Sequence, residues 1–406
     1  MDHTLEHHAS YIGKPISALP TPALVISLPV LRRNIDALHK HVEELGIGFR
    51  PHVKTLKTLE VTRLMLKGGK YRSIVASTLA EVHGVLPLVE EGLLDECLYG
   101  MPIYPGCLPR LAELRKKVRI QLMVDNEQQV AALEETFETH GGSASWDVFI
   151  KLDVGSRRAG VDQADTEALR SLVDRVDSSA ATTLHGFYVH AGHSYGGRRR
   201  DEAEATLNVE LSAVLAAAAL AGNDRELVVS IGSTPTAHVV ASLKAAVPHN
   251  VRLELHAGNY PANDLQQLST GVIAEADQAA RVVAEVCSVY PRRNEALINA
   301  GVVAMSREVA GAYPGFGRVV GKPDWGIVRL SQEHGIIGNT SAVDSDQSAS
   351  RGQAPGVEGV SEQFAVGQRV SLCCNHVCIT AAAFFAFYIV DDHDVVQETW
   401  VPWKGW

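Results

Sequence analysis

Lys54 is the side chain in this sequence whose setting best suits covalent chemistry. It lies in the segment Arg50-Pro-His-Val-Lys-Thr55, directly after a short run of β-forming residues. A lysine attacks a carbonyl only after losing its proton, and burial or neighbouring cations favour that loss. Arg50, His52 and Lys57 are expected to supply the cationic neighbourhood. The competing interpretation is a solvated lysine at the end of a strand, which is the commoner setting for lysine.

This segment resembles the RPHxKT motif of the D-serine dehydratase and D-threonine aldolase family, whose members have the alanine racemase fold type. In that family the lysine holds pyridoxal 5'-phosphate as a Schiff base, so the resemblance implies the same role for Lys54. One position departs from the family, which usually has histidine where this chain has Leu56. The consequence of that replacement stays open.

A second segment, Phe187-Tyr-Val-His-Ala-Gly-His-Ser-Tyr195, is similar to a family segment in which two tyrosines lie by the cofactor. The resemblance implies cofactor contacts for Tyr188 and Tyr195, and packing inside the fold remains the alternative for Tyr188. The same stretch contains a formal G-x-S-x-G motif, which would make Ser194 the nucleophile of a serine hydrolase. That alternative needs an immediate helix after the turn, whereas a Gly-Arg-Arg-Arg stretch follows here.

Two further loops are suited to a phosphate group. The segments 231–236 and 257–260 each follow a β-forming run, and loops of this kind bind phosphate through backbone N–H groups and hydroxyls. The predicted cofactor-binding residues in them are Ser233, Thr234, Thr236, Gly258 and Asn259.

The segment Asp153-Val-Gly-Ser-Arg-Arg-Ala-Gly160 resembles the family's DxGxxRxG stretch, in which the arginine lies by the cofactor ring or its anchoring network. Arg158 holds the matching place. A ring contact and an ion pair with Asp153 are both open for it.

His376 and Cys378 form a candidate metal pair in the segment Asn375-His-Val-Cys378. If the segment is a strand, a spacing of two places both side chains on one face, where both can reach one ion. The alternative is a core cysteine beside a hydrogen-bonded histidine. The segment resembles the family's NHxC pair, which binds zinc in D-serine dehydratases, whereas the related aldolases have a carboxylate in place of the cysteine. The resemblance therefore implies Zn²⁺ ligands.

The composition limits the class of protein. The chain has 406 residues and a net charge of −10 at pH 7, which favours two domains and disfavours nucleic-acid or membrane-surface partners. Six cysteines are too few for a disulfide framework, so we expect reduced thiols in a cytoplasmic protein. No signal peptide is visible. The longest apolar run, 379–390, is shorter than the ~20 residues of a membrane helix and is interpreted as a buried strand.

From residue 47 onward, β-forming runs alternate with helical segments. The expected strands are 47–50, 72–76, 96–99, 120–124, 146–152, 184–189, 227–231 and 252–255. The expected helices are 31–45, 79–91, 108–117, 127–140, 166–176 and 202–221. Eight β/α pairs in about 220 residues are typical of a (β/α)8 barrel, whose active sites gather at the carboxyl ends of the strands. Lys54 follows the first strand.

After about residue 270 the pattern changes to strands without long helices between them, at 280–289, 295–299, 326–330, 335–337, 369–372 and 379–390. The predicted fold is α/β, with a pyridoxal-phosphate-binding (β/α)8 barrel of residues 28–270. Residues 1–27 and 271–406 are predicted to form a second, mainly β domain, as in alanine racemase-like proteins. The polar stretch 340–363 is predicted to be a mobile loop.

The resemblance implies a pyridoxal-phosphate and zinc-dependent dehydratase. Such an enzyme converts D-serine or a related D-3-hydroxy amino acid into a 2-oxo acid and ammonia by α,β-elimination. Zinc is expected to ease the departure of hydroxide, because it lowers the pKa of bound water. The alternatives are metal-activated aldol cleavage, as in D-threonine aldolases, and, more remotely, a non-catalytic carrier of the cofactor. The family also implies a homodimer.

Overall fold

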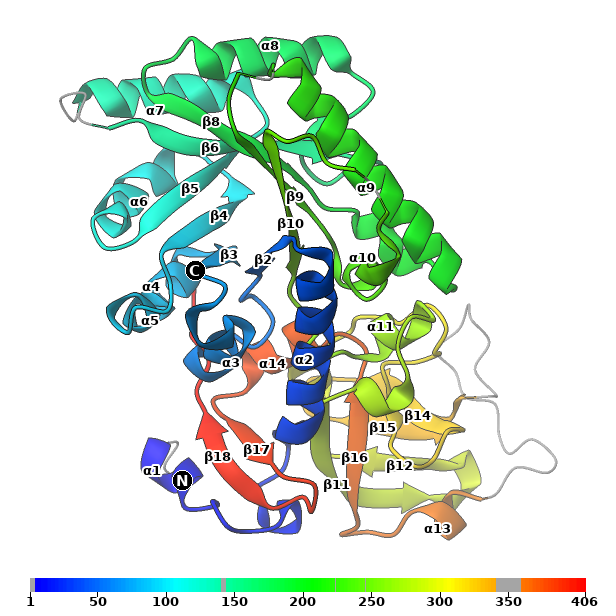
Figure 1. The fold of residues 1–406 in the computed structure, drawn as a ribbon. Helices are drawn as coiled ribbons and strands as arrows, with labels where there is room; N and C mark the ends of the chain where they lie inside the picture. Colours follow the sequence, from blue (N-terminus) through cyan, green and yellow to red (C-terminus); the bar gives the residue numbers. More distant parts are fainter. Residues whose placement is uncertain (1–3, 140–143, 223, 245, 341–358) are drawn as a thin grey trace. The chain divides into compact units, whose positions relative to one another are not determined.

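The chain divides into two units in the computed structural model, which describes residues 4–139, 144–222, 224–244, 246–340 and 359–406 (Figure 1). One unit comprises Ile35–Tyr260 and Trp403–Trp406, and the other comprises Met1–Asn34 and Pro261–Pro402. The sequence analysis put the boundaries at 27/28 and 270/271. The observed boundaries fall inside helix α2 (Leu28–Leu45) and directly after Tyr260, and the last four residues return to the first unit.

The first unit is built on parallel strands that form a nearly closed barrel. Their order is β2 (Gly48–Pro51), β10 (Val251–Ala257), β9 (Leu227–Ile231), β8 (Thr182–Val189), β6 (Trp146–Asp153), β5 (Arg119–Val124), β4 (Glu96–Pro102) and β3 (Ser73–Ala76). A parallel bridge between His52 and Val75 joins the two ends, and β7 (Val161–Asp162) adds to β6. Each predicted strand coincides with one of these eight, so the predicted barrel is confirmed.

Helices follow the strands around the barrel. They are α3 (Leu59–Met65), α4 (Leu79–Gly84), α5 (Leu86–Glu90), α6 (Leu108–Arg115), α7 (Glu127–Thr139), α8 (Thr166–Asp177), α9 (Arg200–Leu220) and α10 (Thr234–Ala237). The helix predicted at 79–91 is two helices, because Pro87 lacks the N–H group that would continue α4 and instead occupies the first turn of α5. By length and composition α9 could cross a membrane, yet its buried face packs against β8 and β9.

The barrel strands carry an apolar cluster and a buried charged cluster. The apolar cluster comprises Val75, Leu98, Met123, Phe149, Tyr188 and Val228. The guanidinium of Arg50 is fully buried and donates hydrogen bonds to Glu254 at 2.7 Å, Glu96 at 2.8 Å and Gln121 at 2.8 Å. Removing one partner of such a buried pair leaves an uncompensated charge, which costs about 3–5 kcal/mol. Arg50 therefore has a structural role in the barrel.

The second unit is a mainly antiparallel β structure. Its strands are β1 (Ala23–Ser27), β11 (Ala280–Tyr290), β12 (Glu295–Ile298), β13 (Gly317–Val319), β14 (Trp325–Leu330), β15 (Gly335–Asn339), β16 (Arg369–Cys374), β17 (Phe387–Val390) and β18 (Val396–Trp400). The strands from β12 through β15, β14, β13 and β16 to β11 close a ring, because β11 also pairs with β12. Strand β1 pairs with β11 and, in parallel, with β17. The predicted β-rich domain is confirmed.

Two predicted segments of this unit, 379–390 and 340–363, had different outcomes. The run 379–390, predicted as one buried strand, is helix α14 (Val377–Ala383) followed by β17. Its Ala-rich first half favours a helix, and its aromatic and β-branched second half favours a strand. Most of the predicted loop at 340–363 lies outside the described residues, and its last part forms helix α13 (Val360–Gln363). The remaining short helices are α1 (Leu5–Ala9), α11 (Leu265–Ser269) and α12 (Val302–Met305).

Candidate active site

Lys54 lies in the first loop at the carboxyl end of the barrel strands, half-buried. It follows the bridge between His52 and Val75, and its backbone N–H donates to Nδ1 of His52 at 3.3 Å. The other ring nitrogen of His52 is 3.0 Å from the Ser77 hydroxyl, so the imidazole ties the Lys54 loop to the loop after β3. The sequence placed Lys54 at a strand end, and the structure has it there.

The residues expected to place positive charge around Lys54 are not the ones that do so in the structure. Arg50 points into the barrel and is paired with two glutamates, and Nζ of Lys57 is 3.1 Å from Glu81. Burial, followed by the charge of Lys54, lowers the pKa of His52 well below its usual value, so this ring is neutral. The three residues named from the sequence therefore add little positive charge.

Lys151 and Arg158 supply the positive charge instead. Lys151 lies on β6 and is buried, with Nζ 4.9 Å from the centre of the Tyr188 ring. Burial lowers its pKa to about 8, and the charges of Arg158 and Lys54 act in the same direction. The sequence analysis missed Lys151. The signal available was a lysine between apolar residues in a run predicted to be a buried strand.

Arg158 is exposed, and its charge acts on His52, Lys151 and Tyr188. The ion pair with Asp153 that was left open for it is not formed between these two described residues. Instead Oδ1 of Asp153 accepts the backbone N–H groups of Gly155 and Arg157. Of the two alternatives, a contact with a bound ligand remains a prediction.

Tyr188 and two histidines line the barrel mouth. The Tyr188 ring stacks on His256, with centroids 4.0 Å apart and planes 12° apart, and Tyr188 also belongs to the apolar cluster. Tyr188 therefore packs inside the fold, as the alternative interpretation expected, and a cofactor contact stays a prediction. His190 is 3.0 Å from the carbonyl oxygen of Gly232. Burial, together with lysine charges, lowers the pKa of His190 and His256 well below the usual value. Tyr195 is half-buried in the following turn, Gly192–Gly196.

The two predicted phosphate loops approach one another, but their hydroxyls bond mostly within the protein. Ser233 caps helix α10, and its Oγ is 2.9 Å from Oγ1 of Thr236. Oγ1 of Thr234 accepts the backbone N–H of Asn259 at 3.2 Å. Backbone N–H groups, rather than these hydroxyls, are therefore the donors that suit an anion at these loops.

Gly258 brings the backbone of its loop close to His52 and Thr55, the residues on either side of the Val53–Lys54 pair. A Cβ there would lie 3.3 Å from the His52 Cβ and 3.5 Å from the Thr55 hydroxyl. Nε2 of His256 is buried and has no hydrogen-bond partner among the described residues. A lysine amine, two further cations and a glycine-lined approach fit an aldehyde cofactor that carries a phosphate.

Glu210 is a second residue that the sequence analysis missed. It projects from α9, is fully buried, and accepts the backbone N–H of Ala191 at 2.8 Å. It also hydrogen-bonds the Thr236 hydroxyl and the Gly232 N–H, so one carboxyl group ties together the loops after β8 and β9. Burial raises its pKa to about 7 against these hydrogen bonds.

Ser194 does not have the setting of a hydrolase nucleophile, so that alternative is wrong. It is buried in the turn Gly192–Gly196, and its Oγ lies 2.8 Å from that of Ser233. Nδ1 of the neighbouring His193 lies 3.4 Å from Ser156. A hydrolase elbow instead exposes the serine on a sharp turn between a strand and a helix.

Acid should destabilise the barrel through its buried histidines. His52, His190 and His256 are neutral when folded, while the unfolded chain gains protons below about pH 6.5. Stability should therefore fall as pH drops below that value, by at most about 1.4 kcal/mol per pH unit for each histidine. Glu210 opposes this loss, because its raised pKa means that the folded protein takes up the proton first.

Urea unfolding at pH 7.5, 6.5 and 5.5 measures this dependence. The variant His256→Phe should have a shallower dependence than the wild type, and His193→Gln, at an exposed position, should match the wild type. A free energy of unfolding that is constant over this range would contradict neutral, buried histidines.

The predicted metal pair lies in the second unit, and its backbone differs from the expectation. Strand β16 ends at Cys374, and His376 is the N-cap of helix α14 (Val377–Ala383), so the strand spacing was the wrong reason to place the two side chains together. They nevertheless hydrogen-bond one another. Nδ1 of His376 is also 3.4 Å from Oε2 of Glu308.

The surroundings of His376 suit a cation. Burial lowers its pKa, but the hydrogen bond and charge of Cys378 and the charge of Asp264 outweigh burial and raise the pKa to about 9. Among the described residues, no group of three or more His, Cys, Asp or Glu side chains could hold a metal ion. His376 and Cys378 supply one imidazole and one thiol, fewer than the three protein ligands usual in a catalytic zinc site, so the zinc site stays a prediction.

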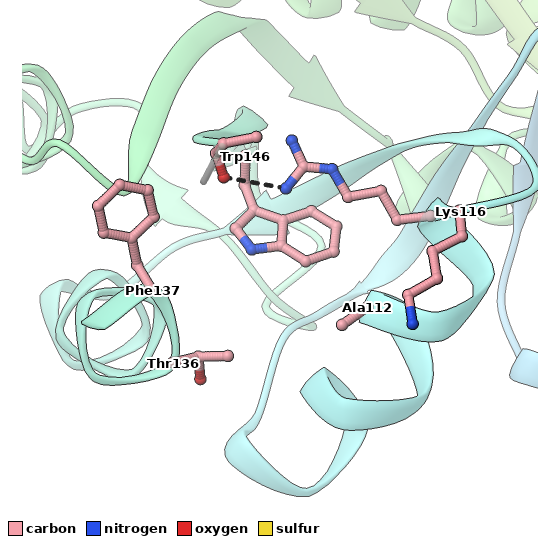
Figure 2. Close-up of a pocket in the computed structure, with 7 residues that line it drawn as sticks. Ala112, Lys116, Thr136, Phe137 and Trp146 are labelled. Atoms are coloured by element: carbon pink, nitrogen blue, oxygen red, sulfur yellow. Dashed lines mark hydrogen bonds between the residues drawn. The ribbon is translucent and has the colours of Figure 1, made fainter. Parts of the chain in front are cut away.

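A separate pocket of about 320 Å³ opens elsewhere on the barrel unit (Figure 2). It includes Trp146, the first residue of β6, on whose ring Arg115 stacks at 4.2 Å. Active sites of this fold lie at the other ends of the strands, and none of the predicted site residues lines this pocket. Its lining residues are Ala112, Arg115, Lys116, Thr136, Phe137, Ala144 and Trp146.

Comparison with known proteins identifies the family. Residues 26–249 match the family model "Alanine racemase, N-terminal domain", and residues 279–390 match the model "Putative serine dehydratase domain". The chain is 41% identical to D-serine dehydratase of Schizosaccharomyces pombe over 98% of this chain and 94% of that protein. It is also 25% identical to a D-threonine aldolase of an Arthrobacter species, over 80% of this chain and 82% of that protein.

A solved structure agrees over the whole length. D-threo-3-hydroxyaspartate dehydratase from Delftia superposes with a TM-score of 0.81 and 28% identity, covering 97% of this chain and 100% of that one. A cysteine-to-alanine variant of that protein has been solved in the metal-free form. The fold, the order of the motifs and these matches together assign the chain to the D-serine dehydratase family of pyridoxal-phosphate lyases with the alanine racemase-like fold.

Proposed function

We propose that this protein is a D-serine dehydratase. It removes water from D-serine, or from a related D-3-hydroxy amino acid, and yields a 2-oxo acid and ammonia. The observation that carries the proposal is the placement of Lys54 at the barrel mouth with Lys151, Arg158 and neutral histidines, in a chain 41% identical to a D-serine dehydratase. The family membership supports the reaction class, and the residues around Lys54 support the cofactor.

Lys54 would hold pyridoxal 5'-phosphate, which draws electrons from Cα of an attached amino acid and so makes the Cα proton acidic. Once released, the Lys54 amine is the base proposed to take that proton. Nearby positive charge favours its neutral form, and Lys151 and Lys54 repel each other when both are protonated. The stacked rings of Tyr188 and His256 offer a flat surface for the cofactor. Arg158, Tyr195 and the loops of Ser233, Thr234, Thr236, Gly258 and Asn259 are the other residues proposed to bind the cofactor.

Zinc is proposed as the second cofactor, held by His376 and Cys378. It would supply Lewis acidity to the departing hydroxide, which is otherwise a poor leaving group. The anionic surroundings that raise the pKa of His376 to about 9 support a cation there. A homodimer and a small D-amino acid as the partner molecule are proposed by analogy with the family, and a cytoplasmic location is proposed from the small number of cysteines.

Aldol cleavage is the competing function, because a D-threonine aldolase is among the relatives. An aldolase removes a proton from the β-hydroxyl and breaks the Cα–Cβ bond, whereas a dehydratase breaks the Cβ–O bond. Cys378 favours dehydration, because the family resemblance pairs a cysteine at this position with dehydratases and a carboxylate with aldolases.

Incubation of the purified protein with D-serine, D-threonine and D-threo-3-hydroxyaspartate decides between the two. We expect pyruvate and ammonia from D-serine, and 2-oxo acids from any other substrate that reacts. L-Serine is the matched control and should not react. Glycine and an aldehyde as the main products would instead establish the aldolase reaction.

A further inference from the structure

The last four residues of the chain pack on the barrel, beside the loop that carries Lys54. The backbone N–H of Trp403 donates to the carbonyl oxygen of Lys57 at 2.8 Å. Its indole ring lies against Gly84 so closely that a Cβ at that glycine would fall 2.2 Å from the ring. Arg110 donates to the carbonyl oxygen of Trp406 at 3.3 Å. The tail, residues 403–406, is thus held at both its ends.

Lys57 closes the turn in which Lys54 lies. Its N–H donates to the carbonyl oxygen of Val53 at 3.2 Å, so residues 53–57 form one turn around Lys54. Lys57 has a φ of 53°, a left-handed conformation that non-glycine residues adopt only when their surroundings hold them there. Trp403 supplies one such restraint and Glu81, 3.1 Å from Nζ of Lys57, supplies another.

A chain of polar contacts continues from Glu81 to the other side of Lys54. Glu81 is almost fully buried, and its Oε2 accepts the backbone N–H of Ser77 at 2.6 Å. The Ser77 hydroxyl contacts Nε2 of His52 at 3.0 Å, and Nδ1 of His52 accepts the N–H of Lys54 at 3.3 Å. Because Nδ1 accepts, Nε2 carries the ring hydrogen and donates it to Ser77.

We propose that Trp403 is a positioning residue for Lys54. The tail holds the turn 53–57 through Lys57, and the Glu81–Ser77–His52 contacts hold it from the other side, so that the amine meets the cofactor in one orientation. This inference rests on the proposed function, because it assumes that Lys54 binds pyridoxal 5'-phosphate. It does not require that the substrate be D-serine.

The experiment measures cofactor binding in full-length variants. Trp403→Ala should raise the dissociation constant for pyridoxal 5'-phosphate at least about tenfold, since the indole that packs against Gly84 and holds the backbone N–H of residue 403 at Lys57 is lost. It should also change the visible absorbance of the Lys54-bound cofactor and the pH at which that absorbance shifts. Trp403→Phe should restore most of the binding. Trp406→Ala is the control, because the Trp406 side chain is 88% exposed.

A second readout needs no cofactor. Nitrogen NMR of labelled histidine in the cofactor-free protein should show His52 protonated at Nε2 in the wild type and as a mixture of tautomers in Trp403→Ala. If Trp403→Ala does not fold, Gly84→Ala takes its place, because the added Cβ must displace the same ring. Binding within twofold of the wild type in Trp403→Ala, or in Gly84→Ala where it replaces that variant, would overturn the inference. A wild-type protein that binds no cofactor at Lys54 would instead overturn the proposed function.

Discussion

Replacing Lys54 by alanine should abolish turnover and the retention of the cofactor together. The variant loses the only amine proposed to hold pyridoxal 5'-phosphate covalently and, in the same step, the proposed base. Removing a residue that acts in this way lowers the rate by on the order of 10³-fold or more. We expect no 2-oxo acid above background from D-serine, and colourless protein after dialysis.

Borohydride trapping and peptide mapping locate the attachment directly. In the wild type the pyridoxyl group should be on the peptide that contains Lys54, and Lys54→Ala should carry none. Lys57→Arg is a matched control in the same peptide, because it keeps the charge that faces Glu81 and removes the competing amine. Lys151→Met tests the buried neighbour whose pKa is lowered to about 8. A label on Lys57 or Lys151 in the wild type would reject the assignment.

The barrel and its mouth could be predicted from the sequence because both depend on local patterns. A β-forming run between helical segments is recognisable from its own residues, and parallel strands bring their carboxyl ends to one edge. Lys54, Tyr188 and the Ser233 and Gly258 loops therefore fall together once the eight strands are assigned. The helix at 79–91 was misjudged only at its one proline.

The residues that were missed act through contacts distant in the chain. The sequence shows Lys151 only as a lysine within a predicted buried strand, and its neighbours became known once that strand was placed between β5 and β8, where burial lowers its pKa. Glu210 lies on the buried face of α9, between Leu207 and Val214, although glutamate usually faces solvent, and its carboxyl group meets two barrel loops. The contact of Trp403 with Lys57 joins residues at opposite ends of the sequence. Periodicity does not identify the contact partners of any of these residues.

His376 and Cys378 lie close together, as predicted, but the strand that was expected to bring them together is not there. The strand expected through His376 ends two residues earlier, and a helix begins there instead. His376 and Cys378 instead lie at the start of a helix, where their side chains are close enough to hydrogen-bond one another. Sequence spacing alone does not discriminate between the two backbones, so the role of the pair depends on its chemistry.

Chelation of the proposed zinc ion should slow dehydration at least about 100-fold and leave cofactor binding intact. Water has a pKa of about 15.7 and zinc-bound water one of about 7 to 9, a difference worth roughly 9 to 12 kcal/mol if fully expressed in the departure of hydroxide. Even a third of the smaller value, about 3 kcal/mol, changes the rate about 100-fold. Attachment of the cofactor to Lys54 breaks no Cβ–O bond, so borohydride trapping should be unchanged. Exchange of the Cα proton with deuterium can also continue.

The variant Cys378→Ala should reproduce the effect of the chelator, because its thiol is half of the proposed protein ligand set. Cys287→Ala removes an exposed thiol on β11, far along the sequence from His376, and should keep both metal content and turnover. The measurement is pyruvate formation from D-serine by protein whose zinc content is established by elemental analysis, before and after zinc is restored. Undiminished turnover by metal-free protein would mean that His376 and Cys378 have only a structural role, because hydroxide would then leave without a metal.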